Sequence, residues 1–282
     1  MSHTSLSHND VETVARELLS AYETGERVAV PPSARPGFDL NTAYQVEATL
    51  KQFREAGGSR AIGRKVGYAN KPLWRVLKLE TLVWAHMYDD TVHYCDRHST
   101  TLSLAHPRSL KIEPEIIFGL KRSMIAEGLD AAAALESAEW LAVGFEIIDC
   151  PYPQWLFQPS DFVASFGLHA ALVIGEQVQV RPDHIATLVD ELPRFKVRVS
   201  KNGEFVEEGS GRNCLRSPAL CLAELSAAIV RRFPTEPLQA GEIVSSGTLT
   251  AGHPTSKGDL WTVNVEGLSL LPPLPPLTLQ LT

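Results

Sequence analysis

The stretch Lys-Ile-Glu-Pro-Glu-Ile-Ile-Phe at residues 111–118 reads as a β-strand that carries two acidic residues. Its apolar residues alternate onto one face, so the carboxylates of Glu113 and Glu115 share the other face. A second apolar segment, at residues 141–148, contains one more acid, Glu146. An ionised carboxylate inside a buried strand is costly unless another group compensates its charge.

Spacing alone leaves two interpretations of these acids open. A hard divalent cation such as Mg²⁺ takes oxygen ligands and keeps positions for water or substrate, so the three carboxylates can form a metal site. Alternatively, Glu113 and Glu115 lie on a solvated edge strand, and Glu146 pairs with an arginine or a lysine. Three carboxylates around one divalent ion leave excess negative charge, so a metal site would also need a nearby cation.

Residues 62–68, Ile-Gly-Arg-Lys-Val-Gly-Tyr, offer such a cation. Arg64 and Lys65 are consecutive on a predicted strand, so only one of them can face the acids, and the other is expected to be solvated. The glycines that flank the pair permit close approach of another group. For Lys65, ordinary surface charge is the alternative interpretation.

The composition is that of an ordinary globular protein, because the 282 residues are 44% hydrophobic and 21% charged. A formal net charge of −7 argues against nucleic acid as a partner, since nucleic-acid-binding surfaces are basic. Met1 to Asp10 are polar and lack the apolar region of a signal peptide, and no apolar run is long enough to span a membrane. The four cysteines show no C-x-x-C pairing, so we expect free thiols and a cytoplasmic protein.

The patterning predicts an α+β protein, mixed and β-rich, with a helical N-terminal unit at residues 1–60 and a β-core at 61–282. Helical spacing predicts one helix from Asp10 to Gly25 and another from a cap at Asn41 to Gly57. Further helices are predicted at 218–233 and, capped by Asp130, at 130–139. The proline-containing segment 268–282 is expected to lie over the core. Strands are predicted at 62–68, 111–120, 140–149, 170–180, 195–200, 242–249 and 260–265, with an Asn-Gly hairpin turn at 201–204.

Several common catalytic motifs are missing. The sequence contains no G-x-G-x-x-G, no G-x-x-x-x-G-K-[ST], no H-E-x-x-H and no G-x-S-x-G, so nucleotide binding, zincin-type hydrolysis and α/β-hydrolase chemistry lack support. The nine histidines are scattered, and His86 and His93 have no third ligand near them in the sequence, so a zinc site is not expected. The oxygen-rich set of three glutamates remains.

The chain resembles the fumarylacetoacetate hydrolase superfamily, and within it the branch of 2-keto-4-pentenoate (2-hydroxypenta-2,4-dienoate) hydratases and 4-oxalocrotonate decarboxylases. The most specific part of the resemblance is the Glu-Pro-Glu motif at 113–115 followed by Gly-Phe-Glu at 144–146. The other matching segments are residues 63–67, 161–164, 213–218 and 246–250. The resemblance implies a fumarylacetoacetate-hydrolase-like β-roll core behind the helical N-terminal unit.

The resemblance also implies a site for a 2-keto acid that chelates Mg²⁺ or Mn²⁺ through its keto oxygen and one carboxylate oxygen. The matching residues are three metal ligands, an active-site lysine and a turn that holds the substrate's polar end. Glu113, Glu115 and Glu146 match the metal ligands, Lys65 matches the active-site lysine, and Gly247 and Thr248 match the turn. Such a cation polarises the 2-oxo group and stabilises the enolate that forms when a proton leaves. The lysine can steady that charge or relay a proton.

The chain departs from the hydratases at the aspartate that they use for proton transfer. The corresponding residues 81–84 contain no acid, and the acids at 89–90 come only later. The family's Ala-Asp-Asn-Ala-Ser stretch is replaced by residues 164–169, which end in His169. His169 is therefore either an acid–base residue in place of the aspartate or a satisfied interior histidine at a strand start. Both interpretations stay open.

The leading hypothesis is a metal-dependent lyase that hydrates a 2-hydroxy-2,4-dienoate in the catabolism of aromatic hydrocarbons. Decarboxylation of a 2-oxo-dioate such as 4-oxalocrotonate, or C–C hydrolysis of an acylpyruvate, passes through the same enolate and remains open. Hydrolysis ranks lower because residues 88–108 show no clear match to the family's histidine-bearing lid, although His86, His93 and His106 lie nearby.

A catalytically silent complex partner is the non-enzyme alternative. Retention of the three glutamates together with Lys65 argues against it. The resemblance implies a homo-oligomer, and a complex with a related decarboxylase or hydratase is a further expectation.

Overall fold

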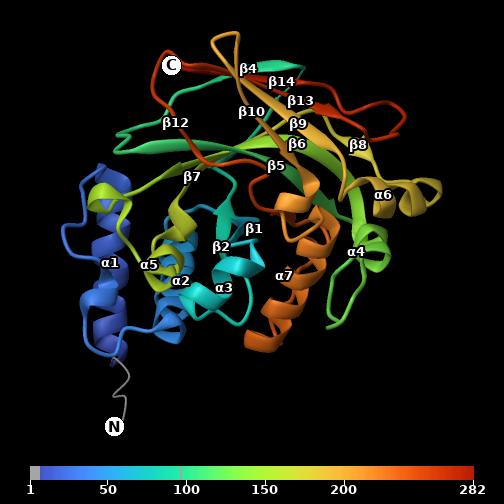
Figure 1. Ribbon diagram of the computed structural model, residues 1–282. Coiled ribbons are helices and arrows are strands. Elements are labelled where there is room, and N and C mark those ends of the chain that lie inside the picture. The colour runs from blue at the N-terminus through green and yellow to red at the C-terminus, as the bar shows by residue number, and fades with distance from the viewer. Residues whose placement is uncertain (1–6, 96) are drawn as a thin grey trace.

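The computed structural model describes residues 7–95 and 97–282 and shows an α+β fold around a curled sheet (Figure 1). The strand order of this sheet is β2 (Val83–Tyr88), β1 (Ala61–Gly67), β11 (Ile243–Ser245), β5 (Leu110–Leu120), β6 (Ala138–Asp149), β7 (His169–Ile174) and β3 (Val92–Tyr94). In addition, β12 (His253–Pro254) pairs with β5, and β8 (Val178–Gln179) pairs with β6. The pairs β1–β11 and β3–β7 are parallel, and the others are antiparallel.

Strands from both ends of this order contribute to one apolar cluster, so the sheet curls around that cluster. Met87 of β2, Val92 of β3 and Ile117 of β5 are among its buried members. Alternation along β5 places Glu113 and Glu115 on the same face as Ile117. The acidic residues therefore lie on the inner face of the curled sheet.

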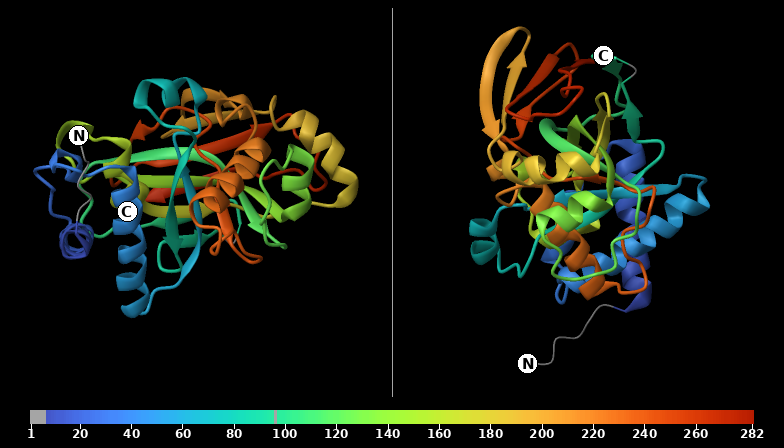
Figure 2. Two further views of the ribbon diagram at one scale, coloured as in Figure 1. Left: turned by 90° about the horizontal axis from the view of Figure 1, so that it is seen from below. Right: turned by 90° about the vertical axis from the view of Figure 1, so that its right-hand side faces the viewer.

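Helices and a second sheet lie on opposite sides of the curled sheet (Figure 1). The helices are α1 (His8–Thr24), α2 (Leu40–Ala56), α3 (Lys71–Leu77), α4 (Ala131–Ser137), α5 (Pro159–Ala164), α6 (Ile185–Glu191) and α7 (Pro218–Arg232). The second sheet has the order β10 (Glu204–Ser210), β9 (Lys196–Lys201), β13 (Leu260–Glu266), β14 (Leu277–Leu281) and β4 (Ser99–Leu102). Helix α7 contacts β2, and β14 contacts β6. Figure 2 shows the β9–β10 hairpin at the edge of the molecule.

The helix ends follow local capping chemistry. Helix α1 ends at Gly25, as predicted, and Gly25 adopts the left-handed conformation. Its start is fixed by a capping box between Ser7 and Asp10. Asp130 caps α4 by accepting from the Ala133 N–H at 2.8 Å, also as predicted. The predicted cap at Asn41 is wrong, because the cap of α2 is Asp39 and Asn41 lies inside the helix.

The strand predictions hold best where the apolar runs are long. The segments 62–68, 111–120 and 140–149 correspond to β1, β5 and β6. The predicted strand at 170–180 is interrupted between β7 and β8. The predicted strand at 242–249 is too long, because β11 ends at Ser245 and Gly247 then adopts a φ of 100°. The C-terminal segment joins the second sheet as β14, paired with β13 and β4.

The division of the chain at residue 60 stays a prediction. Helix α2 packs against α1 and also against α5 of the following region. Ser33, between the two helices, binds the Asp161 carboxylate through its N–H at 2.7 Å and its hydroxyl at 2.6 Å. Residues 1–6 of the polar N-terminal segment lie outside the described residues. In the part that is described, no helix combines the length and the apolarity needed to cross a membrane.

Candidate metal centre and substrate cavity

The sheet register brings the three predicted glutamates together. Glu113 of β5 is the direct cross-strand partner of Glu146 of β6, and Glu115 follows on the same face of β5. One carboxylate oxygen from each residue lies within 4.8 Å of the others. Because β5 pairs with β6 on one side and with β11 and β12 on the other, the edge-strand interpretation is wrong.

Burial and mutual repulsion raise the pKa of two of these acids. Burial raises the pKa of Glu113 to about 7, and the charge of Glu146 adds to the rise. Burial also holds the pKa of Glu115 well above its usual value, with the charges of Glu146 and Glu113 adding to the effect. A divalent cation between the carboxylates would remove this repulsion and favour their ionised forms.

Lys65 reaches the same cluster from β1. Its Nζ lies 2.9 Å from Glu146 Oε2, donates to the Gly167 carbonyl at 2.9 Å and stands 4.8 Å from the centre of the Phe162 ring. Although burial acts to raise it, Lys65 and His169 hold the pKa of Glu146 below its usual value. Glu146 therefore pairs with a lysine, as the alternative interpretation of the acids expects. That lysine is Lys65, which the resemblance also places in the site.

A left-handed turn of the backbone seats Lys65. Phe166, Gly167 and Leu168 have φ values of 55°, 61° and 58°. A Cβ atom on Gly167 would lie 2.7 Å from Lys65 Cδ, so only glycine leaves room for the lysine stem. A run of left-handed residues persists only where the surrounding structure over-determines it, and such strain concentrates at functional sites.

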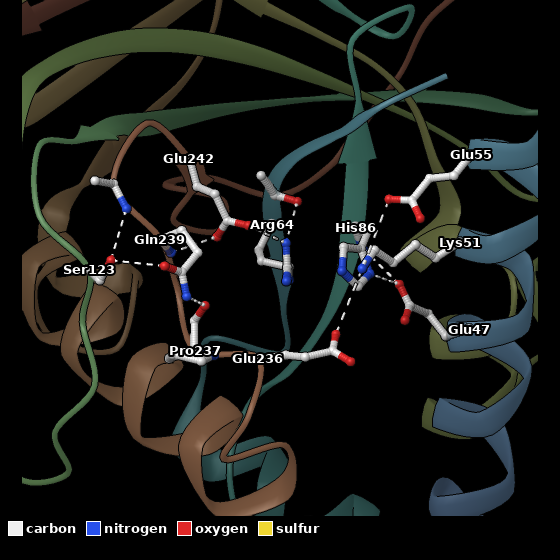
Figure 3. Close-up of polar contacts among 12 residues, drawn as sticks. Glu47, Lys51, Glu55, Arg64, His86, Ser123, Glu236, Pro237, Gln239 and Glu242 are labelled. Carbon is white, nitrogen blue, oxygen red and sulfur yellow. Dashed lines mark hydrogen bonds and ion pairs between the residues drawn. The ribbon is translucent and has the colours of Figure 1, made fainter. Parts of the chain in front are cut away.

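Arg64 points to the outer face of the sheet, and it is buried rather than solvated. Its side chain is 4% exposed, and its NH1 lies 3.0 Å from Glu242 Oε1. Figure 3 shows Arg64 and His86 between Glu242 on one side and Glu47 of α2 on the other. His86 Nδ1 contacts the Glu47 carboxylate. The expectation of a solvated Arg64 is wrong because the Glu242 carboxylate compensates its charge inside the protein.

The turn after β11 supports Glu115. The Ser245 hydroxyl and the Gly247 N–H, at 2.8 Å, both donate to Glu115 Oε2. Gly247 and Thr248 also line the cavity beside the acids. The Thr248 hydroxyl donates to the Thr250 carbonyl at 3.0 Å. That this turn binds a substrate stays a prediction.

His169 stands behind Glu146 rather than in the cavity. Its Nδ1 lies 2.9 Å from Glu146 Oε1, and its Nε2 lies 3.0 Å from Thr91 Oγ1. The side chain is buried, at the start of β7, and it is not among the cavity-lining residues. This is the position of a satisfied interior histidine that orients a carboxylate. Direct acid–base catalysis by His169 stays a prediction.

The inner face opens into a cavity of about 470 Å³ next to Glu113 and Lys65. Its wall includes residues that the sequence reasoning missed: Tyr68, Asn70, Lys111, Trp155, Phe157 and Asn213. Alternation along the strand could have revealed Lys111, because it lies two residues before Glu113. Tyr68 and Asn213 lie in the segments 62–68 and 213–218 noted above, but no pattern there distinguished these two residues from their neighbours. Asn70, Trp155 and Phe157 come from connections between elements, for which the sequence carried no signal.

The acids and histidines that follow residues 81–84, where the hydratase aspartate is missing, do not reach this cavity. The half-buried Asp89 is bound by Arg60 at 2.9 Å, and the exposed Asp90 is bound by Arg54 at 2.6 Å. His93 and His106 line a separate hollow, together with Asp90 and Arg54. Among the described residues, no histidine lines the cavity that contains Glu113.

The residues fit a divalent cation. Among the described side chains, Glu113, Glu115 and Glu146 are the group of His, Cys, Asp or Glu close enough to share an ion. Glu146 Oε2 is fully buried and has the ion pair with Lys65 but no hydrogen bond. Carboxylate oxygens are the donors that Mg²⁺ and Mn²⁺ prefer.

Fold and site together define an α+β protein with a three-carboxylate centre, largely buried, beside a cavity of about 470 Å³. The family model of the fumarylacetoacetate (FAA) hydrolase C-terminal domain matches residues 103–272, and the chain belongs to this family of enzymes. The predicted family and fold class are thereby confirmed.

Known relatives act on small unsaturated acids. Over 92% of this chain and 94% of the relative, the chain is 29% identical to 2-hydroxyhexa-2,4-dienoate hydratase of Comamonas testosteroni. It is 28% identical to 4-oxalocrotonate decarboxylase of Pseudomonas sp. (strain CF600), over 83% and 84% of the two chains. A solved 4-oxalocrotonate decarboxylase from Pseudomonas putida G7, complexed with magnesium and adipate, superposes with a TM-score of 0.86 at 22% identity, covering 99% of each chain.

Proposed function

We propose that this protein is a divalent-metal-dependent lyase that hydrates a 2-hydroxy-2,4-dienoate, a 2-keto-4-enoate, in the catabolism of aromatic compounds. The observation that carries the proposal is the cluster of Glu113, Glu115 and Glu146 with Lys65 ion-paired to it, open to a cavity of about 470 Å³. The hydratases among its relatives support the same reaction class.

In this proposal Glu113, Glu115 and Glu146 hold Mg²⁺, with Mn²⁺ as a working substitute. When bound, the ion polarises the 2-oxo group of the acid and stabilises the negative charge of its enolate. The protein fixes the ligand geometry beforehand: Ser245 and the Gly247 N–H hold Glu115, and His169 holds Glu146. Outer contacts of this kind orient ligands and tune their basicity.

Lys65 is the group that moves the proton. Hydration of a 2-keto-4-enoate adds the hydroxyl of water to C4 and a proton to C5, and a proton also leaves and returns at C3, next to the 2-oxo group. Lys65 is 2% exposed, its Nζ lies 2.9 Å from Glu146 Oε2, and the residue lines the cavity that would hold this chain. Thr248, which lines the same cavity, binds the polar end of the substrate.

Decarboxylation of a 2-oxo-dioate such as 4-oxalocrotonate is the second candidate. It is favoured by the positions of Asp89 and Asp90, which pair with Arg60 and Arg54 away from the cavity, so no aspartate among the described residues lines it. C–C hydrolysis of an acylpyruvate ranks third, because no histidine among the described residues lines the cavity.

An assay of three substrates separates these reactions. The chelator-stripped protein, resupplied with Mg²⁺ or Mn²⁺, is given 2-hydroxypenta-2,4-dienoate, 4-oxalocrotonate or an acylpyruvate, while ultraviolet absorbance and CO₂ release are followed. We expect metal-dependent loss of the dienoate absorbance without CO₂. Release of CO₂ from 4-oxalocrotonate alone would move the assignment to the decarboxylase. If calorimetry detects no binding of either metal, the silent complex partner becomes the better description.

We further propose a cytoplasmic homo-oligomer that can associate with a related decarboxylase or hydratase. The location is supported by the four cysteines, which are all free and buried, as expected in a reducing compartment. Light scattering of the purified protein, alone and mixed with such a partner, tests the assembly.

A further inference from the structure

We propose that Lys111 receives a second anionic group at the far end of the substrate, so the site selects 2-oxo acids with a distal carboxylate over those with an apolar tail. This inference rests on the proposed function, because it assumes that the 2-oxo acid head binds at the three glutamates. It concerns the tail of the substrate, which the assigned reaction leaves open.

Lys111 is the cation in the cavity that lacks a carboxylate partner. Of the other charged side chains there, Lys65 pairs with Glu146 at 2.9 Å, Glu207 contacts His253 at 2.8 Å, and Glu113 belongs to the proposed metal centre. For Lys111, by contrast, no ion pair is formed with any described residue. An unpaired ammonium group on the wall of a substrate cavity is a binding point for an anion.

Trp155 holds the Lys111 ammonium group against the cavity wall. Lys111 Nζ lies 3.9 Å from the centre of the Trp155 ring. The ring is itself fixed, because its Nε1 donates to Ser109 Oγ at 2.8 Å, and residues 154–155 have left-handed φ values of 56° and 58°. A cation–π contact positions the lysine but leaves its charge available, since it is weaker than a charge-assisted hydrogen bond to a carboxylate.

The position of Lys111 along β5 matches a tail contact rather than a head contact. The metal centre extends from Glu113 toward Glu115, which Ser245 and Gly247 hold. Lys111 lies two residues from Glu113 in the opposite direction on the same face, which corresponds to about 7 Å along a strand. A short carbon chain whose 2-oxo acid end is at the glutamates can therefore place a distal carboxylate beside Lys111.

The test compares acids that differ only in the distal carboxylate. Calorimetry of the Mn²⁺-loaded protein measures the Kd of 2-oxoadipate against 2-oxohexanoate, and of the seven-carbon pair 2-oxoheptanedioate and 2-oxoheptanoate. These acids lack the double bond, so they bind without being hydrated. We expect the dioate to bind about tenfold more tightly than the monoacid for at least one chain length. In Lys111→Met this ratio should fall to about one.

Lys71→Met is the matched control. Lys71 also stands over a tryptophan, 5.6 Å from the Trp74 ring, but it is exposed and does not line the cavity. This variant should keep the natural selectivity. Lys111→Gln repeats the test in case the methionine variant folds poorly, and circular dichroism checks both.

Two results would overturn the inference. One is equal binding of dioate and monoacid at both chain lengths by the natural protein. The other is an equal loss of affinity for both acids in Lys111→Met, which would assign Lys111 to the head carboxylate. If neither acid binds in a Mn²⁺-dependent way, the proposed function itself fails, and that outcome differs from loss of selectivity alone.

Discussion

Arg64 and Lys65 are neighbours on β1 whose charged groups end in two separate ion pairs on opposite faces of the sheet. Lys65 Nζ lies 2.9 Å from Glu146 on the inner face, and Arg64 NH1 lies 3.0 Å from Glu242 on the outer face. Glu242 directly precedes β11, in which Ser245 is the register partner of Lys65. The outer pair thus joins the same two segments whose strand alignment places Ser245 and Lys65 in one site.

Lys65→Met should reduce kcat by roughly 100-fold or more while changing Mn²⁺ affinity little, because the variant loses the proton-bearing group and keeps every proposed ligand. Steady-state kinetics and Mn²⁺ calorimetry on the same preparation measure the two effects. An equal loss of turnover and metal binding would place Lys65 in a structural role.

Arg64→Met should lower the free energy of unfolding by about 3 kcal/mol, because it leaves the Glu242 carboxylate without its partner. Urea unfolding measures this change. The Mn²⁺ Kd of the folded variant should stay within about twofold of the natural value, since Arg64 is on the outer face. Loss of metal binding at unchanged stability would contradict the separation of the two faces. Arg64→Met combined with Glu242→Gln should recover part of the stability.

Glu146→Gln should abolish metal-dependent turnover and weaken Mn²⁺ binding by more than the roughly 100-fold typical of lost outer contacts. The substitution keeps the side-chain volume, so the fold should be retained in circular dichroism. Glu207→Gln is the control, because Glu207 lines the cavity but pairs with His253 instead of the proposed ion. Similar Mn²⁺ affinities in the two variants would remove Glu146 from the ligand set.

The thermal stabilisation by Mn²⁺ should grow as the pH rises from 6 to 8. In the metal-free protein the pKa of Glu113 is raised from 4.5 to about 7, so the folded state holds more protons than the unfolded state in this window. Metal-free stability therefore falls as pH rises through it. Metal binding needs the ionised carboxylates, so raising the pH strengthens it. Melting temperatures with Mn²⁺ and with chelator at pH 6, 7 and 8 test this. The difference should shrink in Glu113→Gln, and a pH-independent gain would contradict the assignment.

The parts of the site on long strands could be predicted from the sequence, because alternation fixes which side chains share a face. This holds for Glu113 and Glu115, and the predicted strand around Glu146 supplied their partner. The alternation of Arg64 and Lys65 was also correct. The burial of Arg64 was not, because its partner Glu242 is distant in the sequence and only the β1–β11 pairing brings it near.

Apart from Gly247 and Thr248, which the resemblance indicated, and Lys111, most of the cavity wall could not be predicted, because it depends on tertiary contacts rather than on a repeating pattern. Trp155 lines the cavity from a turn in which residues 154–155 adopt left-handed conformations. His169 sits at a strand start, as one of the two interpretations had it, but its contact with Glu146 follows from the pairing of β6 with β7. Such contacts leave no local signature in the chain.

The residues proposed to bind the 2-oxo acid head stand on strands, whereas most of the cavity-wall residues named above stand on connections between elements. The glutamates and Lys65 stand on β5, β6 and β1, whereas Trp155 and Phe157 stand on the connection between β6 and α5. Exchanging or randomising residues 151–158 would therefore alter which acids are accepted while the ion-holding framework stays in place. Substrate preference could therefore be redesigned by changing this one short connection.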